Sequence, residues 1–293
     1  MPSIPDIMAS LGAWLAGPLE FDFMRRALLA SVLVGALCAV IGAFVVLKGL
    51  AFIGDALAHA SFAGVAVALV GGRDVYAGGA AAAVFAALAI SFISQRGRVR
   101  ADTAIGVVFV AMLSFGVLVM SRLRNYSASI FEFLFGNVLA VGPEDLWLIA
   151  LGGAAIVGVI ALLYKELLFV AFDPAMAAGA GLPVAFYETL LLVLLAVTAT
   201  LAMRALGIIL VAAMLVTPAA TAYLFVKRLH HQMLLGALIA IGASVAGLYL
   251  SFYGNFASGA TIVLVSVGIF LLALLVAPRT RRGGAPLRAV LEQ

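Results

Sequence analysis

The stretch Gly54–Gly64, GDALAHASFAG, places two ionisable side chains, Asp55 and His59, in an otherwise apolar segment that runs from Ala51 to Val70. Residues four apart share one face of a helix, with Cβ atoms roughly 5–6 Å apart. Ionisable groups inside a membrane span are costly and by default mark an ion or substrate path. A carboxylate and a neutral imidazole also form half of a ligand shell for a divalent transition metal. The pair equally fits a structural role, in which Asp55 caps the helix and His59 hydrogen-bonds to a neighbouring helix.

The composition of the chain is that of an integral membrane protein. Of its 293 residues, 66% are hydrophobic and only 10% are charged, and the mean hydropathy is +1.26, whereas a soluble domain carries about 25% charged residues. We therefore expect one all-α transmembrane domain over residues 1–293, within membrane lipid, with 30 glycines that allow close helix packing. The Lys and Arg residues are spread among loops, so no nucleic-acid partner is expected. The one cysteine, Cys38, allows no intrachain disulfide.

Hydropathy predicts about nine transmembrane helices, because roughly 20 apolar residues cross a bilayer. Eight is possible, since the apolar stretch 130–141 is too short to cross and is expected to form an interfacial or re-entrant helix. Residues 1–24 are expected to lie at the membrane interface, and 279–293 to form an inner tail. The nine candidate spans are 25–47, 51–70, 75–94, 103–121, 145–164, 186–203, 206–226, 233–252 and 259–277.

The distribution of positive charge predicts an outer N-terminus and an inner C-terminus. Cytoplasmic loops carry an excess of Lys and Arg, and this orientation puts eleven of the 17 on the inner side and six on the outer side. The inner set is Lys48, Arg96, Arg98, Arg100, Lys165, Lys227, Arg228, Arg279, Arg281, Arg282 and Arg288, and the outer set is Arg25, Arg26, Arg73, Arg122, Arg124 and Arg204.

Three predicted spans have unusual composition. Small residues crowd 78–90, GGAAAAVFAALAI, which predicts tight packing of the third span against a neighbour. The seventh span is expected to be interrupted at Thr217 and Pro218, and the eighth at Gly242 and Gly247. Such breaks either line a transport path or are packing kinks.

The inner connection 165–183, KELLFVAFDPAMAAGAGLP, is predicted to be a loop that contains one short helix. Asp173 is a helix N-cap and Pro174 occupies the first helical position. Gly181, followed by Pro183, ends the helix. A short, capped and weakly charged helix between spans is typical of a docking element, and a plain surface loop is the alternative.

The remaining polar residues indicate no enzyme chemistry. The chain lacks GxxxxGK[ST], so it has no phosphate-binding loop and is expected to hydrolyse no ATP itself. Asp102 and Glu188 are expected in the first turns of their helices, where the helix dipole favours acids. Arg204 is expected to snorkel to the outer interface.

Several stretches together resemble the membrane-spanning subunits of bacterial ABC importers for zinc, manganese and iron. This resemblance covers almost all of residues 25–277 in the family's order. It rests on Leu47–Ala66 (LKGLAFIGDALAHASFAGVA), Ala101–Phe109 (ADTAIGVVF), Leu134–Leu146 (LFGNVLAVGPEDL), the DPAMAAGAG segment and Ala205–Ala222 (ALGIILVAAMLVTPAATA).

The resemblance implies a permease subunit of the bacterial cytoplasmic membrane, with the helical fold of vitamin B12 and iron-siderophore permeases. It implies a homodimer or a pair with a related subunit, two copies of a cytoplasmic ATPase, and an extracytoplasmic metal-binding protein. The ATPase-coupling residues would be Asp173, Pro174, Ala177, Gly179 and Gly181.

Two copies around a two-fold axis would offer two Asp55 carboxylates and two His59 imidazoles to the transported metal. GDALAHAS and FGNVLAV look more like the zinc permeases, so Zn²⁺ is the expected substrate, and no cofactor is expected to stay bound. The alternatives are Mn²⁺ or Fe²⁺ on the same machinery, a proton-coupled secondary transporter that uses Asp55 and His59 as a relay, and a membrane scaffold that transports nothing.

Overall fold

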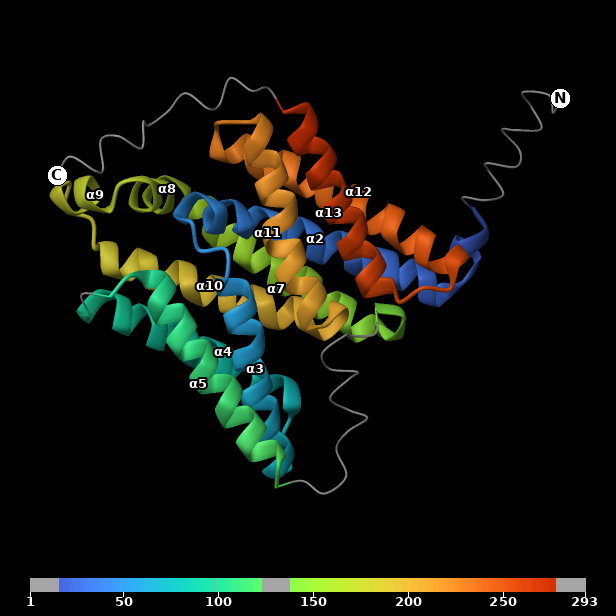
Figure 1. Cartoon of the computed structure of the whole chain (residues 1–293), viewed down its shortest axis with the longest axis horizontal. Helices are drawn as coiled ribbons and strands as arrows, with labels where there is room; N and C mark the ends of the chain where they lie inside the picture. The colour runs from blue at the N-terminus through green and yellow to red at the C-terminus, as the bar shows by residue number, and fades with distance from the viewer. Residues whose placement is uncertain (1–15, 98, 123–137, 278–293) are drawn as a thin grey trace.

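The computed structural model describes residues 16–97, 99–122 and 138–277, and within these ranges every regular element is a helix, as predicted. Figure 1 shows their arrangement. In chain order the elements are η1 Gly17–Glu20, α2 Asp22–Lys48, α3 Ile53–Val70, α4 Val75–Arg96, α5 Ala101–Met120, η2 Val138–Ala140, α7 Pro143–Leu162, α8 Tyr164–Phe172, α9 Pro174–Gly179, α10 Val184–Leu206, α11 Ile208–Phe225, α12 Leu229–Gly254 and α13 Ser258–Val276.

Each of the nine predicted spans corresponds to a helix. Among the described residues, eight helices are long and apolar enough to cross a membrane, and a ninth apolar helix, within α11, is shorter. This agrees with the expectation of about nine spans, with eight possible. The predictions for 1–15, for 130–137 and for the tail 279–293 concern residues outside the described ranges.

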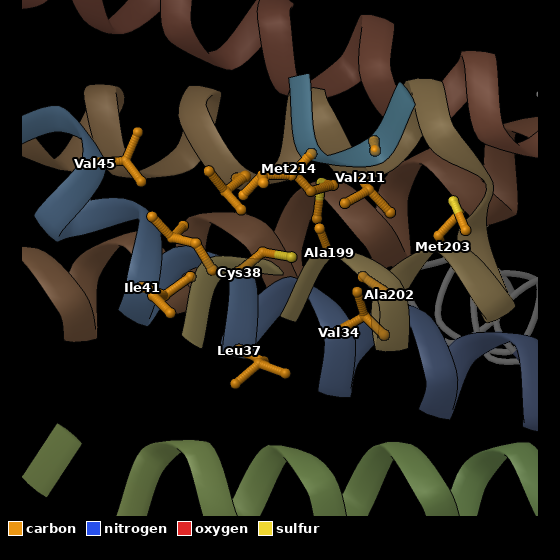
Figure 2. Packing of buried hydrophobic residues seen from close by; sticks show 14 of the residues in the cluster. Val34, Leu37, Cys38, Ile41, Val45, Ala199, Ala202, Met203, Val211 and Met214 are labelled. Atoms are coloured by element: carbon orange, nitrogen blue, oxygen red, sulfur yellow. The ribbon is translucent and has the colours of Figure 1, made fainter. Parts of the chain in front are cut away.

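The core is organised around α2, which packs against α7, α10, α11 and α12. Figure 2 shows side chains of α2, α10 and α11 meeting in one apolar cluster. Cys38 lies in this cluster with no exposed surface, so the only thiol of the chain is shielded from solvent in the fold. The labelled members are Val34, Leu37, Cys38, Ile41 and Val45 of α2, Ala199, Ala202 and Met203 of α10, and Val211 and Met214 of α11.

Helices α3, α4 and α5 pack on one another and form a group on one side of the molecule (Figure 1). A Cβ built on Gly64 of α3 would lie 2.0 Å from the Gly78 carbonyl oxygen of α4, so only glycine allows this approach. The predicted tight packing of the small-residue span is therefore confirmed. Helix α10 contacts α4, α3 and α2, and so connects this group to the α2 core.

The predicted interruptions of the seventh and eighth spans are wrong at the level of secondary structure. Helix α11 continues through Pro218, and α12 continues through Gly242 and Gly247. Contacts of α11 with α2, α12 and α13 explain why packing overrides the local preference of proline. The Thr221 hydroxyl donates to the Thr217 carbonyl oxygen at 2.7 Å, within the same helix.

The segment 165–183 is mostly helical, which corrects the prediction of a loop. Helix α8 follows α7 after the single residue Leu163, and α9 follows α8 after the single residue Asp173. The predicted cap is confirmed, because the Asp173 carboxylate accepts a hydrogen bond from the Met176 N–H at 2.9 Å. Gly181, with φ +85°, lies in the turn after α9. Helices α8 and α9 lie at one end of the molecule, beside the start of α10 (Figure 1).

Candidate metal site

Asp55 and His59 lie one turn apart in the first half of α3. The His59 Nδ1 atom is 2.9 Å from the Asp55 carbonyl oxygen and 3.3 Å from the Asp55 carboxylate oxygen Oδ1. The Asp55 side chain is 45% exposed and that of His59 is 21% exposed. The pair is therefore formed within one helix, and its carboxylate remains accessible.

The contacts of His59 determine which ring nitrogen is available to a metal. A backbone carbonyl oxygen only accepts hydrogen bonds, so Nδ1 carries the proton and donates it to the Asp55 carbonyl. The neutral ring then has its lone pair on Nε2, to which no described residue is hydrogen-bonded. Histidine ligands of metals commonly donate the other ring N–H in this way, which fixes the tautomer and the ring orientation.

The surroundings argue against the purely structural interpretation of the pair. The N-cap residue of α3 is Phe52, and no side chain caps this helix, so Asp55 is not its cap. His59 hydrogen-bonds to its own helix, and its contact with a neighbour is an edge-to-face packing on Phe109 of α5, with ring centroids 5.1 Å apart. Neither half of the structural explanation therefore accounts for these two residues.

Asp55 opens into a cavity of about 230 Å³ between α3 and α5. Asp102, at the start of α5, lines the same cavity. Asp102 does lie in the first turn of its helix, as predicted, but the sequence did not show that it would line the same cavity as Asp55. The only signal was its position in the ADTAIGVVF stretch, which carries part of the family resemblance.

One chain does not supply a complete shell. Among the described residues there is no group of three or more His, Cys, Asp or Glu side chains that holds a metal ion. Asp55 and His59 provide one carboxylate and one imidazole, whereas a bound transition metal takes at least four ligands. A site on α3 therefore needs ligands from a second molecule, from water, or from both.

An ion pair that the sequence did not reveal joins the start of α10 to the end of α2. The end of α2 lies a few residues before α3 in the chain. Lys48, the last residue of α2, makes an ion pair of 2.6 Å with Glu188 of α10, and both side chains are largely buried. Glu188 was expected in the first turn of its helix; because α10 begins at Val184, it lies beyond that turn and pairs with Lys48 instead.

A second polar contact joins α10 to α4 beside this ion pair. The Ser91 and Thr189 hydroxyl oxygens are 2.6 Å apart, and the Gln95 amide donates to both, at 2.8 and 3.1 Å. The start of α10, which follows α9 after a turn of four residues, thus contacts both α2 and α4 through polar side chains.

Arg204 has a specific partner at the opposite end of α10, which corrects the expectation that it only snorkels. Its Nε atom lies 2.6 Å from Asp145 Oδ1 of α7, and its guanidinium carbon is 4.3 Å above the ring of Tyr76 of α4. The Nε–H is not aligned as a hydrogen bond, so this contact is primarily ionic. Arg204 therefore joins the ends of three helices.

The fold and the site together define a class of protein: a multi-pass helical transporter whose ionisable pair lies within a span. The comparisons with known proteins give the family. Residues 20–277 match the family model of the ABC 3 transport family, so the chain belongs to that family. It is a permease subunit of a bacterial ABC importer in the inner membrane, its ATPase is a separate subunit, and an extracytoplasmic binding protein delivers its substrate.

Three similar proteins illustrate the class. The manganese transport system membrane protein MntC of Listeria monocytogenes is 41% identical over 266 residues, which cover 91% of this chain and 95% of the relative. A probable iron transport system membrane protein of Haemophilus influenzae is 34% identical over 261 residues, covering 89% and 96%. The solved structure of PsaBC from Streptococcus pneumoniae in complex with Fab superposes with a TM-score of 0.81 at 36% identity, covering 92% of this chain and 98% of that one.

The expectation of zinc as the substrate is not confirmed, because these relatives are named for manganese and iron. The zinc preference rested partly on the GDALAHAS stretch, which includes Leu57 and Ala58. Both side chains are fully buried in the helix packing. They leave no surface open to an ion, and their identity therefore carries little information about which metal crosses.

Proposed function

We propose that this permease moves Mn²⁺ across the membrane in an ATP-driven importer, and that Asp55 and His59 bind the ion in transit. The observation that carries the proposal is the orientation of His59: its Nδ1–H is held by the Asp55 carbonyl, which leaves the Nε2 lone pair available on a ring one helix turn from the accessible Asp55 carboxylate. A carboxylate oxygen and a neutral imidazole nitrogen at one helix turn are a suitable pair of ligands for a divalent transition metal.

Ligand chemistry and relatives both favour manganese. Oxygen ligands suit Mn²⁺, and the cavity beside Asp55 offers a second carboxylate, Asp102, and space for water. The absence of thiolate ligands suits a transient site, since Cys38, the only cysteine, is buried in the α2 core. MntC, which is 41% identical, is named as a manganese transport protein. Fe²⁺ is the second candidate, because a relative at 34% identity is named for iron transport.

We further propose that two copies of the chain form a homodimer, which supplies two carboxylates and two imidazoles around one axis. This would complete a shell that one chain lacks among its described residues. We assign the docking of two ATPase copies to α9: Ala177 is fully buried and anchors the helix, Met176 is 65% exposed, and a Cβ on Gly179 would meet no atom within 4 Å. This proposal places the end of the molecule bearing α9 on the cytoplasmic side.

The test is uptake of ⁵⁴Mn²⁺ by the complete transporter in liposomes supplied with ATP. Asp55→Ala and His59→Ala should each reduce uptake at least tenfold, while the variants still dimerise and copurify with the ATPase. Asp22→Ala and His231→Ala remove the same residue types from exposed positions outside the site and should transport normally. Zn²⁺ and Fe²⁺ should compete less well than unlabelled Mn²⁺.

Two outcomes would contradict the proposal. Near-normal uptake by both alanine variants would mean that α3 carries no ion site. Uptake driven by a proton gradient in liposomes that contain the permease alone would show a secondary transporter.

A further inference from the structure

A large groove opens at the end of the molecule that also carries α8 and α9. Its volume is about 1010 Å³, and its walls come from the end of α2, from α8, and from the turn between α11 and α12. In Figure 1 these elements lie together toward the upper left of the molecule. None of the residues assigned to the metal path or to ATPase docking lines this groove.

The lining of the groove divides into a basic edge and an apolar wall. Four residues with basic side chains line it, and no Asp or Glu does. Within the described part of the chain, none of the four is paired with a carboxylate. They are Lys165 of α8, and Lys227, Arg228 and His230 at the turn between α11 and α12.

The apolar wall is rich in aromatic rings. Tyr164, Phe169 and Phe172 of α8 face the groove, as does Tyr223 at the end of α11. Phe172 is 78% exposed, so most of the surface of this apolar side chain is not covered by protein. Tyrosine and tryptophan side chains are enriched at the level of the lipid headgroups in membrane proteins.

A buried hydrogen bond fixes the basic edge in place. Gln232 is only 3% exposed, and its side-chain amide donates to the Val226 carbonyl oxygen at 2.8 Å. This bond closes the turn between α11 and α12 and holds Lys227 and Arg228 on the edge of the groove. The arrangement is therefore a built feature of the fold and not a chance gathering of mobile surface lysines.

Charge and position select the occupant. A basic edge without acids attracts an anion, and aromatic and aliphatic walls beside it suit acyl chains. Basic pockets between transmembrane helices on the cytoplasmic side bind the headgroups of anionic lipids. The chain's own tail, 279–293, carries Arg279, Arg281, Arg282 and Arg288 against one acid, Glu292, so it lacks the charge to fill a basic groove.

We propose that this groove is a binding site for an anionic phospholipid of the inner leaflet. The phosphate group lies against Lys165, Lys227 and Arg228, and the acyl chains lie along Phe169 and Phe172. The proposal rests on the proposed orientation, with the end bearing α9 on the cytoplasmic side, and is independent of the identity of the transported metal.

The experiment is native mass spectrometry of the full-length permease, released from detergent with defined lipid added. Dioleoyl phosphatidylglycerol should form a one-to-one adduct, and dioleoyl phosphatidylcholine should not. The double variant Lys227→Gln/Arg228→Gln should weaken the adduct about thirtyfold, because each cation near an anionic lipid contributes about 1 kcal/mol, or about fivefold. The charge-retaining variant Lys227→Arg/Arg228→Lys should bind like the unmodified chain.

A matched control removes two cations of the turn between α4 and α5. Arg96→Gln/Arg100→Gln changes the net charge by the same amount, but neither residue lines the groove. This variant should therefore leave the adduct unchanged. Thermal melting of each variant shows that it is folded, and an unfolded variant is replaced by the single change Lys165→Gln, which should weaken the adduct about fivefold.

Four results would each overturn the proposal. The first is equal retention of the two lipids. The second is equal loss of the adduct in the control variant. The third is full competition by sn-glycerol 3-phosphate, which would show that the groove binds a free phosphate. The fourth is release of the lipid on addition of the purified ATPase subunit, which would show that the groove is an ATPase contact.

Discussion

Gly64 of α3 lies against Gly78 of α4 with no room for a Cβ, and Gly64→Ala tests this contact. The added Cβ would lie 2.0 Å from the Gly78 carbonyl oxygen and 2.5 Å from the Ala82 Cβ. Both neighbours are rigid, since one is backbone and the other a methyl group on a helix. The two helices must therefore separate by about 1 Å before the contact reaches the shortest distances that real Cβ atoms show.

The expected cost follows from this overlap. Overpacking of a well-packed core costs about 1–3 kcal/mol, and for a domain of roughly this size each kcal/mol lowers Tm by about 2–4 °C. We expect Gly64→Ala to melt about 2–12 °C below the unmodified chain. Gly268→Ala is the matched control, because its Cβ would meet no atom within 4 Å and alanine favours a helix by up to about 1 kcal/mol. Its Tm should be unchanged or slightly higher.

The chain contains its own probe for this measurement. Cys38 is the only cysteine and has no exposed surface, so a thiol-reactive dye labels it only as the helices come apart. Detergent-purified Gly64→Ala that reacts with the dye at the same temperature as the unmodified chain, or at a higher one, would refute the described packing of α3 on α4. The folded variant should also transport poorly, because metal–ligand distances tolerate only about 0.2 Å.

Three further predictions concern ATPase docking, the Lys48–Glu188 ion pair and the membrane topology. Gly179→Trp should abolish ATPase copurification while the permease still inserts and dimerises, because the added ring would project from the open face of α9; unchanged copurification and uptake would exclude α9 as the docking helix. Lys48→Gln and Glu188→Gln should each slow metal uptake and lower Tm, and the exchanged pair Lys48→Glu/Glu188→Lys should recover part of both, which would not occur if their 2.6 Å contact were incidental. In a Cys38→Ala background, a cysteine replacing Arg100 should resist an impermeant maleimide applied from outside; labelling there would reverse the predicted topology.

Local features of this protein were readable from its sequence. The spans follow from runs of apolar residues, and the cap of α9 follows from Asp173 and Pro174 alone, since both depend on neighbours within a few positions. The Asp55–His59 pair was visible because a spacing of four places two residues on one face of a helix.

Features that depend on distant residues were not readable. Lys48 and Glu188 are 140 residues apart, and nothing in either neighbourhood names the other as its partner. The same holds for Arg204, Asp145 and Tyr76, which meet only because three helices end together. At Pro218 the sequence predicted a helix break that the structure does not have. Packing of neighbouring helices against α11 keeps it helical although proline locally disfavours a helix.

The choice of metal was beyond the sequence for a related reason. Asp55 and His59 suit several divalent ions, and one chain supplies only part of the shell. The residues that seemed to distinguish the zinc branch, Leu57 and Ala58, are buried in helix packing.

We expect a metal ion in transit to be bound by His59 through a ring nitrogen and by Asp55 through a carboxylate. Mn²⁺ is paramagnetic, so pulsed electron paramagnetic resonance of the Mn²⁺-loaded permease–ATPase complex detects a directly bound ¹⁴N nucleus. We predict ¹⁴N modulation from one Mn²⁺ per two permease chains, which is lost in His59→Ala and retained in His231→Ala. Mn²⁺ bound without ¹⁴N modulation, or with modulation that persists in His59→Ala, would contradict it.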